Sequence, residues 1–149
     1  ANAWPAGHVA ELYRGLSDDG LRPLVVLGPG DGALAEGLRP LLPEEAFAPP
    51  TTLLELAHLV AQARVFVGTD CGPRHLAASL GVPTVTLFGP TDPAGWNPAA
   101  PRHVSVRTGV DCSPCDLTDC PVPGHPCMMD LEPGAVRQAV ERILAGQSR

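Results

Sequence analysis

Residues 69–72 (Thr-Asp-Cys-Gly) form a turn whose side chains and backbone could bind a charged ligand. The apolar run at residues 65–67 before the turn predicts a buried strand, and Pro73 after it suits the start of a helix. The first N–H groups of a helix have no intrahelical partner, so they favour an anion such as a phosphate. His75 lies in the first turn of that helix and could donate to the same anion.

Each of these residues also has a structural interpretation. His75 could be an ordinary surface residue of a helix, and Asp70 could only cap the helix or close the turn. Asp31 follows Gly-Pro-Gly, which is itself a common turn, and Asp92 could only shape the loop that follows residues 89–90. The ligand-binding interpretation is favoured for His75 and Asp70, because both lie where a strand ends and a helix begins.

Four cysteines gather in a loop at residues 109–130 with the spacing C-x2-C-x4-C-x6-C, at Cys112, Cys115, Cys120 and Cys127. Four thiols could hold a tetrahedral Zn²⁺ ion as a structural clip without an open catalytic position. An iron–sulfur cluster is a further interpretation, although the spacing differs from common ferredoxin patterns, and His125 is another candidate ligand. The alternatives are a reduced cysteine-rich loop, or disulfides formed after purification. Cys71 stands apart from this group.

The surrounding elements are predicted from hydrophobic periodicity and turn residues. Helices are expected over residues 6–17, 33–42, 52–63, 73–80 and about 133–145, and strands over 23–27, 65–67, 85–88 and 103–107, with a further short strand at 45–48. Thr52 and Glu55 fit a capping box, and Leu53, Leu56, Leu59 (or Val60) and Ala63 are expected to face inward.

Alternating strands and helices predict an α/β fold, a Rossmann-like parallel sheet with helices on both faces. The chain opens on a loop and a helix, so such a sheet would lack its usual first strand, and a first residue other than Met suggests a missing or processed N-terminus. A length of 149 residues fits a single domain over residues 1–149. The net charge of −6 argues against a nucleic-acid-binding surface, and no apolar run approaches the roughly 20 residues of a membrane helix.

Residues 70–75 (Asp-Cys-Gly-Pro-Arg-His) resemble the motif of glycosyltransferase family 9, the bacterial lipopolysaccharide heptosyltransferases. The family pattern is Asp, then Thr or Ser, Gly, an apolar residue, any residue, and His. Further matches, in the same order and spacing, are Trp4-Pro5, residues 27–31, residues 89–93, and the cysteine loop that ends in Cys127-Met128 and precedes a helix that begins with proline.

The resemblance implies an enzyme with two Rossmann-like domains facing a cleft (GT-B), of which this chain resembles the C-terminal, donor-binding domain. The implied site positions are Asn2, Thr69, Asp70, Cys71, Gly72, Pro73 and His75 at the donor phosphates, with Asp70 directed toward the sugar; Asp31 and Thr51 at the ribose and base; and Gly89, Pro90, Thr91 and Asp92 beside the sugar.

Three departures from the family pattern stand out. Cys71 replaces Thr or Ser and removes a hydroxyl, and Asn2 takes the place of a lysine that pairs with the phosphates in several members. Arg74 could partly compensate if it points toward the phosphates. The general base is a carboxylate of the N-terminal domain, so no catalytic residue is expected in this chain, and the isolated chain should bind nucleotide without turnover.

The resemblance implies an inverting transfer of heptose from ADP-heptose to the lipopolysaccharide inner core. It implies no cofactor for catalysis, an acceptor (lipid A and core oligosaccharide) bound through the other domain, and a place in the cytoplasm at the inner face of the inner membrane, with peripheral membrane contact left open. Reduced cysteines are consistent with that compartment. The alternatives are another nucleotide-sugar enzyme of similar fold, such as an epimerase, and a non-catalytic metal or redox module built on the cysteine loop.

Overall fold

A computed structural model describes residues 2–147 of the chain. Its sheet has three parallel strands in the order β1 (Phe66–Thr69), β2 (Thr84–Leu87) and β3 (His103–Val106). The register places Val85 of β2 between Val67 of β1 and Val104 of β3. The predicted α/β class with a parallel sheet is therefore confirmed, and the three strands lie within two residues of their predicted positions.

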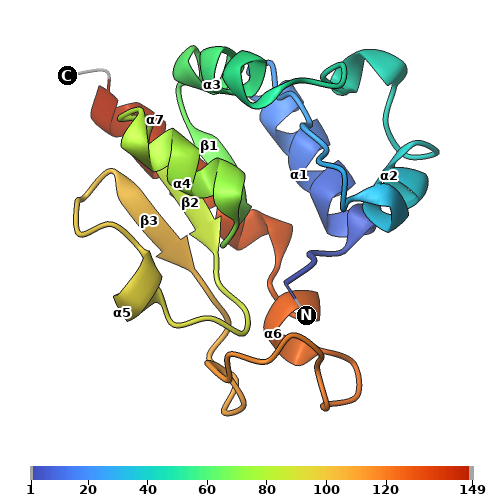
Figure 1. Cartoon of the computed structure of the whole chain (residues 1–149), viewed down its shortest axis with the longest axis vertical. Helices are drawn as coiled ribbons and strands as arrows, with labels where there is room; N and C mark the ends of the chain where they lie inside the picture. Colours follow the sequence, from blue (N-terminus) through green and yellow to red (C-terminus); the bar gives the residue numbers. More distant parts are fainter. Residues whose placement is uncertain (1, 148–149) are drawn as a thin grey trace.

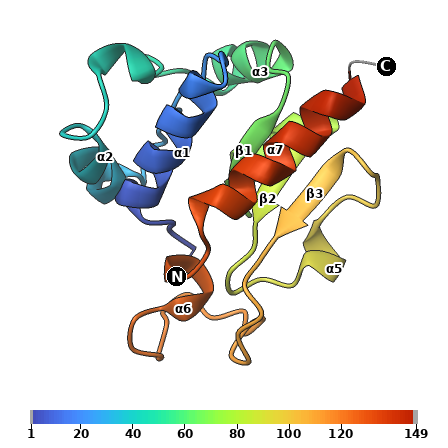
Figure 2. The ribbon, with the colours of Figure 1, turned by 180° about the vertical axis from the view of Figure 1, so that it is seen from behind.

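Helices cover both faces of this sheet. Figure 1 shows α4 (Gly72–Ser79) in front of the strands, and Figure 2, the view from behind, shows α7 (Pro133–Gln147) in front of the opposite face. α4 packs on β1 and β2, whereas α7 packs on β2 and β3. The central strand β2 is consequently buried along its whole length, and Val85 and Leu87 join Val136 and Val140 of α7 in the main hydrophobic core.

Of the remaining helices, α1 (Ala6–Asp18), α2 (Gly32–Leu38) and α3 (Leu53–Ala61) lie beside the sheet, and the short helices α5 (Pro93–Trp96) and α6 (Pro126–Met129) lie near the carboxyl ends of its strands (Figure 1). α1 packs against α7 and against α2, and α3 packs against α4. A 3₁₀ turn η1 (Glu44–Ala46) precedes α3, while α5 and α6 flank the loops that follow β2 and β3. No helix within residues 2–147 is long and apolar enough to cross a bilayer.

The predicted strand at residues 23–27 was wrong. Val25 makes an isolated parallel bridge with Phe47, and the expected strand at 45–48 is the turn η1 followed by that bridge. Val25 and Leu27 pack with the α1–α2 cluster, and Leu24 is 44% exposed. The apolar run therefore packs in the hydrophobic cluster of α1 and α2 and does not join the sheet. A single bridge between Val25 and Phe47 does not make a strand.

Two helices also differ in detail from their predictions. α2 ends at Leu38 rather than near residue 42. The capping box of Thr52 and Glu55 is present at α3, but Leu53 is 74% exposed and Ala63 is also exposed, so neither faces inward as predicted. The predicted inward contacts of Leu56 and Val60 are confirmed. α6 interrupts the predicted cysteine loop near its end.

Candidate functional site

The turn between β1 and α4 presents a helix N-terminus at the carboxyl edge of the sheet. Cys71 is the extended N-cap residue of α4, and its carbonyl accepts hydrogen bonds from the backbone N–H groups of Arg74 (3.1 Å) and His75 (3.2 Å). Thr69 ends β1, and Pro73 lies in the first turn of the helix. A Cβ atom added at Gly72 would meet nothing within 4 Å, so there is open space beside this N-terminus. The arrangement suits an anion.

Arg74 is the most buried charged residue of the site and does not point to solvent. Its side chain is 0% exposed, and its Nη2 atom donates to Oδ1 of Asp70, whose carboxylate is 7% exposed. Its Nη1 atom donates to the carbonyl of Trp96 at 3.0 Å, and the guanidinium lies 5.9 Å from the ring centre of Phe88. The predicted compensation by Arg74 at the phosphates is therefore not seen; the arginine neutralises Asp70 instead.

His75 completes this cluster on its outer side. The side chain is 45% exposed, and its Nε2 atom lies 3.2 Å from Oδ1 of Asp70 and 3.2 Å from Nη2 of Arg74. Its ring stands edge-on to Trp96 with centroids 6.0 Å apart. His75 is thus held on one edge, while the other edge is available to a ligand.

Cys71 is a neutral neighbour of the cluster. Burial raises the pKa of its thiol above the ordinary value of 9.0, more than the nearby Arg74 backbone contact lowers it. The thiol therefore stays protonated at neutral pH and adds no negative charge beside the helix N-terminus.

The N-terminal segment brings Asn2 to the same turn. Its Nδ2 atom donates to the backbone carbonyl of Asp70 at 2.7 Å. The segment is anchored by Trp4, which is 7% exposed and donates from Nε1 to the carbonyl of Leu131 at 2.9 Å. The predicted association of Asn2 with the Asp70 turn is therefore present in the structure, although Asn2 binds the loop backbone and supplies no charge.

The turn after β2 is tied to the cysteine loop through its backbone. The carbonyl of Gly89 accepts a hydrogen bond from the hydroxyl of Ser113 at 2.5 Å. The carbonyl of Pro90 accepts from the N–H groups of Cys115 and Asp116, both at 2.8 Å. These bonds make the cysteine loop a support for the turn.

Asp92 has a structural role in this geometry. Its Oδ1 atom accepts from the N–H of Ala94 at 2.9 Å and so caps α5, the short helix that carries Trp96. Asp92 therefore helps to place Trp96, the aromatic neighbour of His75, and its assignment beside the sugar stays a prediction.

A hollow of about 290 Å³ adjoins the Asp70 turn and is lined by Asn2, Pro90, Thr91, Asp116, Leu117 and Thr118. The Oδ1 atom of Asn2 and the Oγ1 atom of Thr91 are buried there without a hydrogen-bond partner among the described residues. Buried polar atoms are normally paired, so these two unpaired atoms are exceptions, and neither has surface open to the hollow. The hollow thus joins a predicted phosphate residue with a predicted sugar residue.

Asp31 and Thr51 are not joined to this cluster by any hydrogen bond or ion pair described for residues 2–147. Asp31 accepts from the N–H of Gly28 at 2.6 Å and closes its own turn before α2. Thr51 precedes the capped start of α3 and is half-buried. In this structure Asp31 adopts its turn interpretation, and the assignment of both residues to ribose and base stays a prediction.

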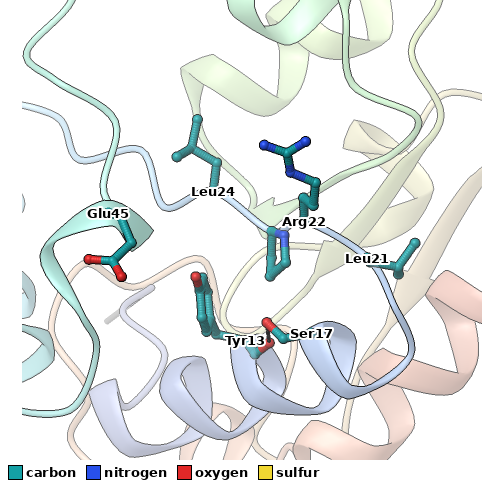
Figure 3. Close-up of a pocket in the computed structure, with 7 residues that line it drawn as sticks. Tyr13, Ser17, Leu21, Arg22, Leu24 and Glu45 are labelled. Carbon is teal, nitrogen blue, oxygen red and sulfur yellow. Dashed lines mark hydrogen bonds between the residues drawn. The ribbon is translucent and has the colours of Figure 1, made fainter.

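A separate hollow of about 450 Å³ lies between α1 and the segment at residues 21–24 (Figure 3). It is lined by Tyr13, Ser17, Leu21, Arg22, Pro23, Leu24 and Glu45, none of which is a predicted site residue. The hydroxyl of Ser17 donates to the backbone of its own helix at Tyr13, at 2.9 Å. This hollow shares no lining residue with the hollow beside Asn2. Because the predicted site residues lie at the α4 N-terminus and at the smaller hollow, these two features form the candidate site.

Comparison of the sequence with known protein families gives one match. Residues 1–125 match the sequence profile of glycosyltransferase family 9 (heptosyltransferase). The chain belongs to glycosyltransferase family 9. Lipooligosaccharide heptosyltransferase 2 of Campylobacter jejuni is 28% identical over 152 residues, which are 97% of this chain and 47% of that protein. The chain thus spans less than half the length of this family 9 relative.

Two solved structures resemble the family 9 fold of this chain. The structure of E. coli ADP-heptose lps heptosyltransferase II aligns with a TM-score of 0.79 over 100% of this chain and 44% of that one; at 24% identity this likeness concerns the fold alone. E. coli heptosyltransferase WaaC with ADP-2-deoxy-2-fluoro heptose aligns with a TM-score of 0.65 and 28% identity, over 95% of this chain and 39% of that one.

The cysteine loop of this family 9 chain does not form a metal centre in the structure. All five cysteines are free thiols, and the described residues contain no group of three or more His, Cys, Asp and Glu side chains that could hold a metal ion. Cys127 is 4% exposed, and the thiol of Cys120 lies 3.6 Å from the carbonyl of Val122. Burial first, and then the charges of Cys120, Cys112 and Cys115, raise the pKa of the Cys127 thiol, so the other three thiols of the loop lie near Cys127.

The zinc site at Cys112, Cys115, Cys120 and Cys127 stays a prediction from their spacing. Cys127 and Met128 pack beneath Gly89. A Cβ atom at Gly89 would collide with the sulfur of Met128 and lie 3.4 Å from that of Cys127. In this family 9 chain the loop supports the turn that follows β2.

Sequence reasoning missed the roles of Arg74 and Trp96. The opposite charges of Asp70 and Arg74, four residues apart across the start of α4, were a weak signal for the ion pair, because Asp70 precedes the N-cap residue of the helix. No comparable signal pointed to Trp96, whose contact with Arg74 joins residues 22 positions apart.

Proposed function

We propose that this chain is the donor-binding part of an inverting heptosyltransferase that transfers heptose from ADP-heptose to the inner core of lipopolysaccharide. The observation that carries the proposal is the N-terminus of α4, where His75 is exposed beside a charge-compensated Asp70–Arg74 pair. Family membership supports the reaction class. The names of similar proteins, which include an ADP-heptose enzyme and a complex with a fluorinated ADP-heptose, support the donor.

In the proposed reaction, an acceptor hydroxyl attacks the anomeric carbon of the heptose from the side opposite the diphosphate. The bond between that carbon and the phosphate oxygen breaks, and ADP leaves with the electron pair. The backbone amides of Cys71 and Gly72 and the side chain of His75 stabilise the negative charge that grows on the leaving phosphate. The proposal requires no metal ion or other cofactor for this step.

The charges around the proposed diphosphate favour this role. The carboxylate of Asp70 alone would repel phosphate, but Arg74 compensates its charge, and the Cys71 thiol is neutral. The helix N-terminus then contributes partial positive charge near the leaving group. We place the sugar of the donor in the hollow lined by Asn2 and Thr91, which adjoins this turn.

We propose that the acceptor site and the general base lie outside these 149 residues, because the chain spans 47% of its C. jejuni relative. The acceptor proton would pass to that base. The reaction would take place in the cytoplasm at the inner face of the inner membrane, where the acceptor, lipid A with its core sugars, is anchored. These 149 residues should then bind the donor without transferring heptose.

Isothermal titration calorimetry of the folded chain with ADP, ADP-heptose and UDP tests the proposal. We expect ADP and ADP-heptose to bind more tightly than UDP, and the substitution His75→Ala to weaken ADP binding by about tenfold, as expected for one lost charge-assisted hydrogen bond. His58→Ala is the matched control, because His58 is exposed on α3 and bonds to its own helix. Absence of ADP binding to folded protein would refute the proposal.

A further inference from the structure

Three polar atoms, one each from His75, Asp70 and Arg74, lie close together at the inner edge of the His75 ring. Nε2 of His75 lies 3.2 Å from Oδ1 of Asp70 and 3.2 Å from Nη2 of Arg74, and that same Nη2 donates to Oδ1. All protein contacts of the ring's polar atoms are on this edge, so Nδ1 has no hydrogen bond to the part of the chain that the structure describes. Nδ1 is therefore the nitrogen left for a ligand.

The tautomer of neutral His75 depends on which neighbour bonds to Nε2. A carboxylate only accepts, so a bond to Asp70 needs hydrogen on Nε2; a guanidinium only donates, so a bond to Arg74 needs a lone pair there. In the first case Nδ1 would carry a lone pair, which a phosphate oxygen repels. In the second case Nδ1 carries the hydrogen and can donate to phosphate.

Burial decides between the two cases in favour of Arg74. Its side chain is 0% exposed, and its Nε atom already lacks a partner within residues 2–147. Nη2 carries two hydrogens, and the bond to Asp70 uses one of them. Leaving the second unpaired would add another unmade hydrogen bond on a buried charged group, whereas Oδ1 of Asp70 is already paired with Arg74.

We infer that Arg74 is a positioning residue that fixes neutral His75 as the Nδ1–H tautomer. His75 is then a hydrogen-bond donor toward the ligand without first gaining a proton. The inference rests on the proposed function in one respect, namely that the ligand facing Nδ1 is the diphosphate of a nucleotide-sugar. Arg74 does not touch that ligand and acts through the ring of His75.

The tautomer can be read directly by long-range ¹H–¹⁵N NMR of the imidazole rings in the ligand-free chain. His58 provides an internal reference for the Nδ1–H form, because its Nδ1 lies 2.9 Å from the carbonyl of Leu54, which only accepts. We expect His75 to match His58 in the wild-type chain. An Nε2–H spectrum of wild-type His75 would overturn the inference.

The substitution Arg74→Met keeps an unbranched side chain but removes the donor. His75 should then switch to Nε2–H, bonded to Asp70, while His58 stays unchanged. Because Arg74→Met leaves a buried carboxylate and could prevent folding, Asp70→Asn is the second variant. It retains Arg74, so His75 should keep Nδ1–H; a switch to Nε2–H in this variant would show that Asp70 sets the tautomer and would overturn the inference.

ADP binding separates positioning from a general structural effect. We expect Arg74→Met to weaken ADP binding about tenfold in the native background, and less than about twofold when His75 is already alanine, because interacting residues are not additive. Equal losses in both backgrounds would overturn the inference. If the wild-type chain binds no ADP, the proposed function fails, while the NMR result still decides whether Arg74 sets the tautomer.

Discussion

The buried pair of Asp70 and Arg74 makes a quantitative prediction about stability. The substitution Asp70→Ala leaves the guanidinium, which is 0% exposed, with the carbonyl of Trp96 as its remaining oxygen partner. Removing one member of a buried ion pair typically costs about 3–5 kcal/mol, because the other charge stays buried and uncompensated. We therefore expect Asp70→Ala to lower the free energy of unfolding by about 3–5 kcal/mol.

The double variant Asp70→Ala with Arg74→Met tests the reason for that loss. Methionine fills much of the space of the arginine stem and brings no charge, so the uncompensated guanidinium disappears. Replacing both members of a buried pair by apolar groups is often close to neutral. The double variant should therefore be more stable than Asp70→Ala alone, by about 2 kcal/mol or more.

Urea unfolding followed by circular dichroism measures these free energies, provided that the m-values of the variants agree. The matched control is Asp19→Ala, which breaks the exposed pair of Asp19 with Arg137. Solvent and salt screen such a pair, so this loss should be much smaller. The reasoning is refuted if Asp70→Ala and Asp19→Ala destabilise equally, or if the two single losses at Asp70 and Arg74 simply add.

Three further predictions concern the scaffold. Gly89→Ala should cost about 1–3 kcal/mol by overpacking against buried Met128, whereas Gly95→Ala, with no atom within 4 Å of its Cβ, should be nearly neutral; equal effects in thermal melts would contradict this. Thr52→Ala should cost about 1 kcal/mol through loss of a helix cap, and Thr52→Ser should restore it; helix capping is not the cause if serine does no better than alanine. Burial holds the pKa of His103 below its ordinary value of 6.5, so its contribution to stability is complete above pH 6.5 and is lost as the pH falls below that value toward the folded pKa. Melting temperatures measured from pH 7 to pH 5 should fall less steeply in His103→Gln, and parallel curves would count against the assignment.

The βαβ unit could be predicted from sequence because its signals are local. The apolar runs at residues 65–67 and 85–88 are each bounded by turn residues, and Pro73 marks the start of the helix between them. The run at residues 23–27 carries the same local signal but forms no strand. A strand requires a neighbour to pair with, and Val25 finds Phe47 alone, which no local pattern could show.

The sequence predicted which residues lie together at the Asp70 turn, but it could not predict the directions of their side chains. The structure confirms that Asn2 lies against the Asp70 turn and that Asn2 and Thr91 share a hollow. The inward direction of Arg74 depends on Phe88 and on the carbonyl of Trp96, both of which are remote in the chain. An i, i+4 ion pair is equally compatible with an exposed surface, so burial was not predictable.

The spacing of the cysteines likewise could not establish whether their sulfur atoms converge. Cys127 belongs to the hydrophobic core beneath Gly89, and its neighbours Cys112, Cys115 and Cys120 lie in an irregular loop. Loop geometry depends on distant contacts such as that of Ser113 with Gly89, so whether the four thiols bind a metal ion stays a prediction.

Under the proposed function, a chain with a net charge of −6 binds a diphosphate at the turn of Asp70 and Cys71. Both residues could carry negative charge beside the ligand, and neither contributes a net one: Arg74 compensates Asp70, and burial keeps the Cys71 thiol protonated. The partial charge of the α4 N-terminus and the outward edge of His75 then dominate the local field. The departure from Thr or Ser at Cys71 is therefore compatible with phosphate binding, because it removes a hydroxyl without adding a charge. Asp70 is held by Arg74 and lies beside His75, and its predicted direction toward the sugar stays a prediction.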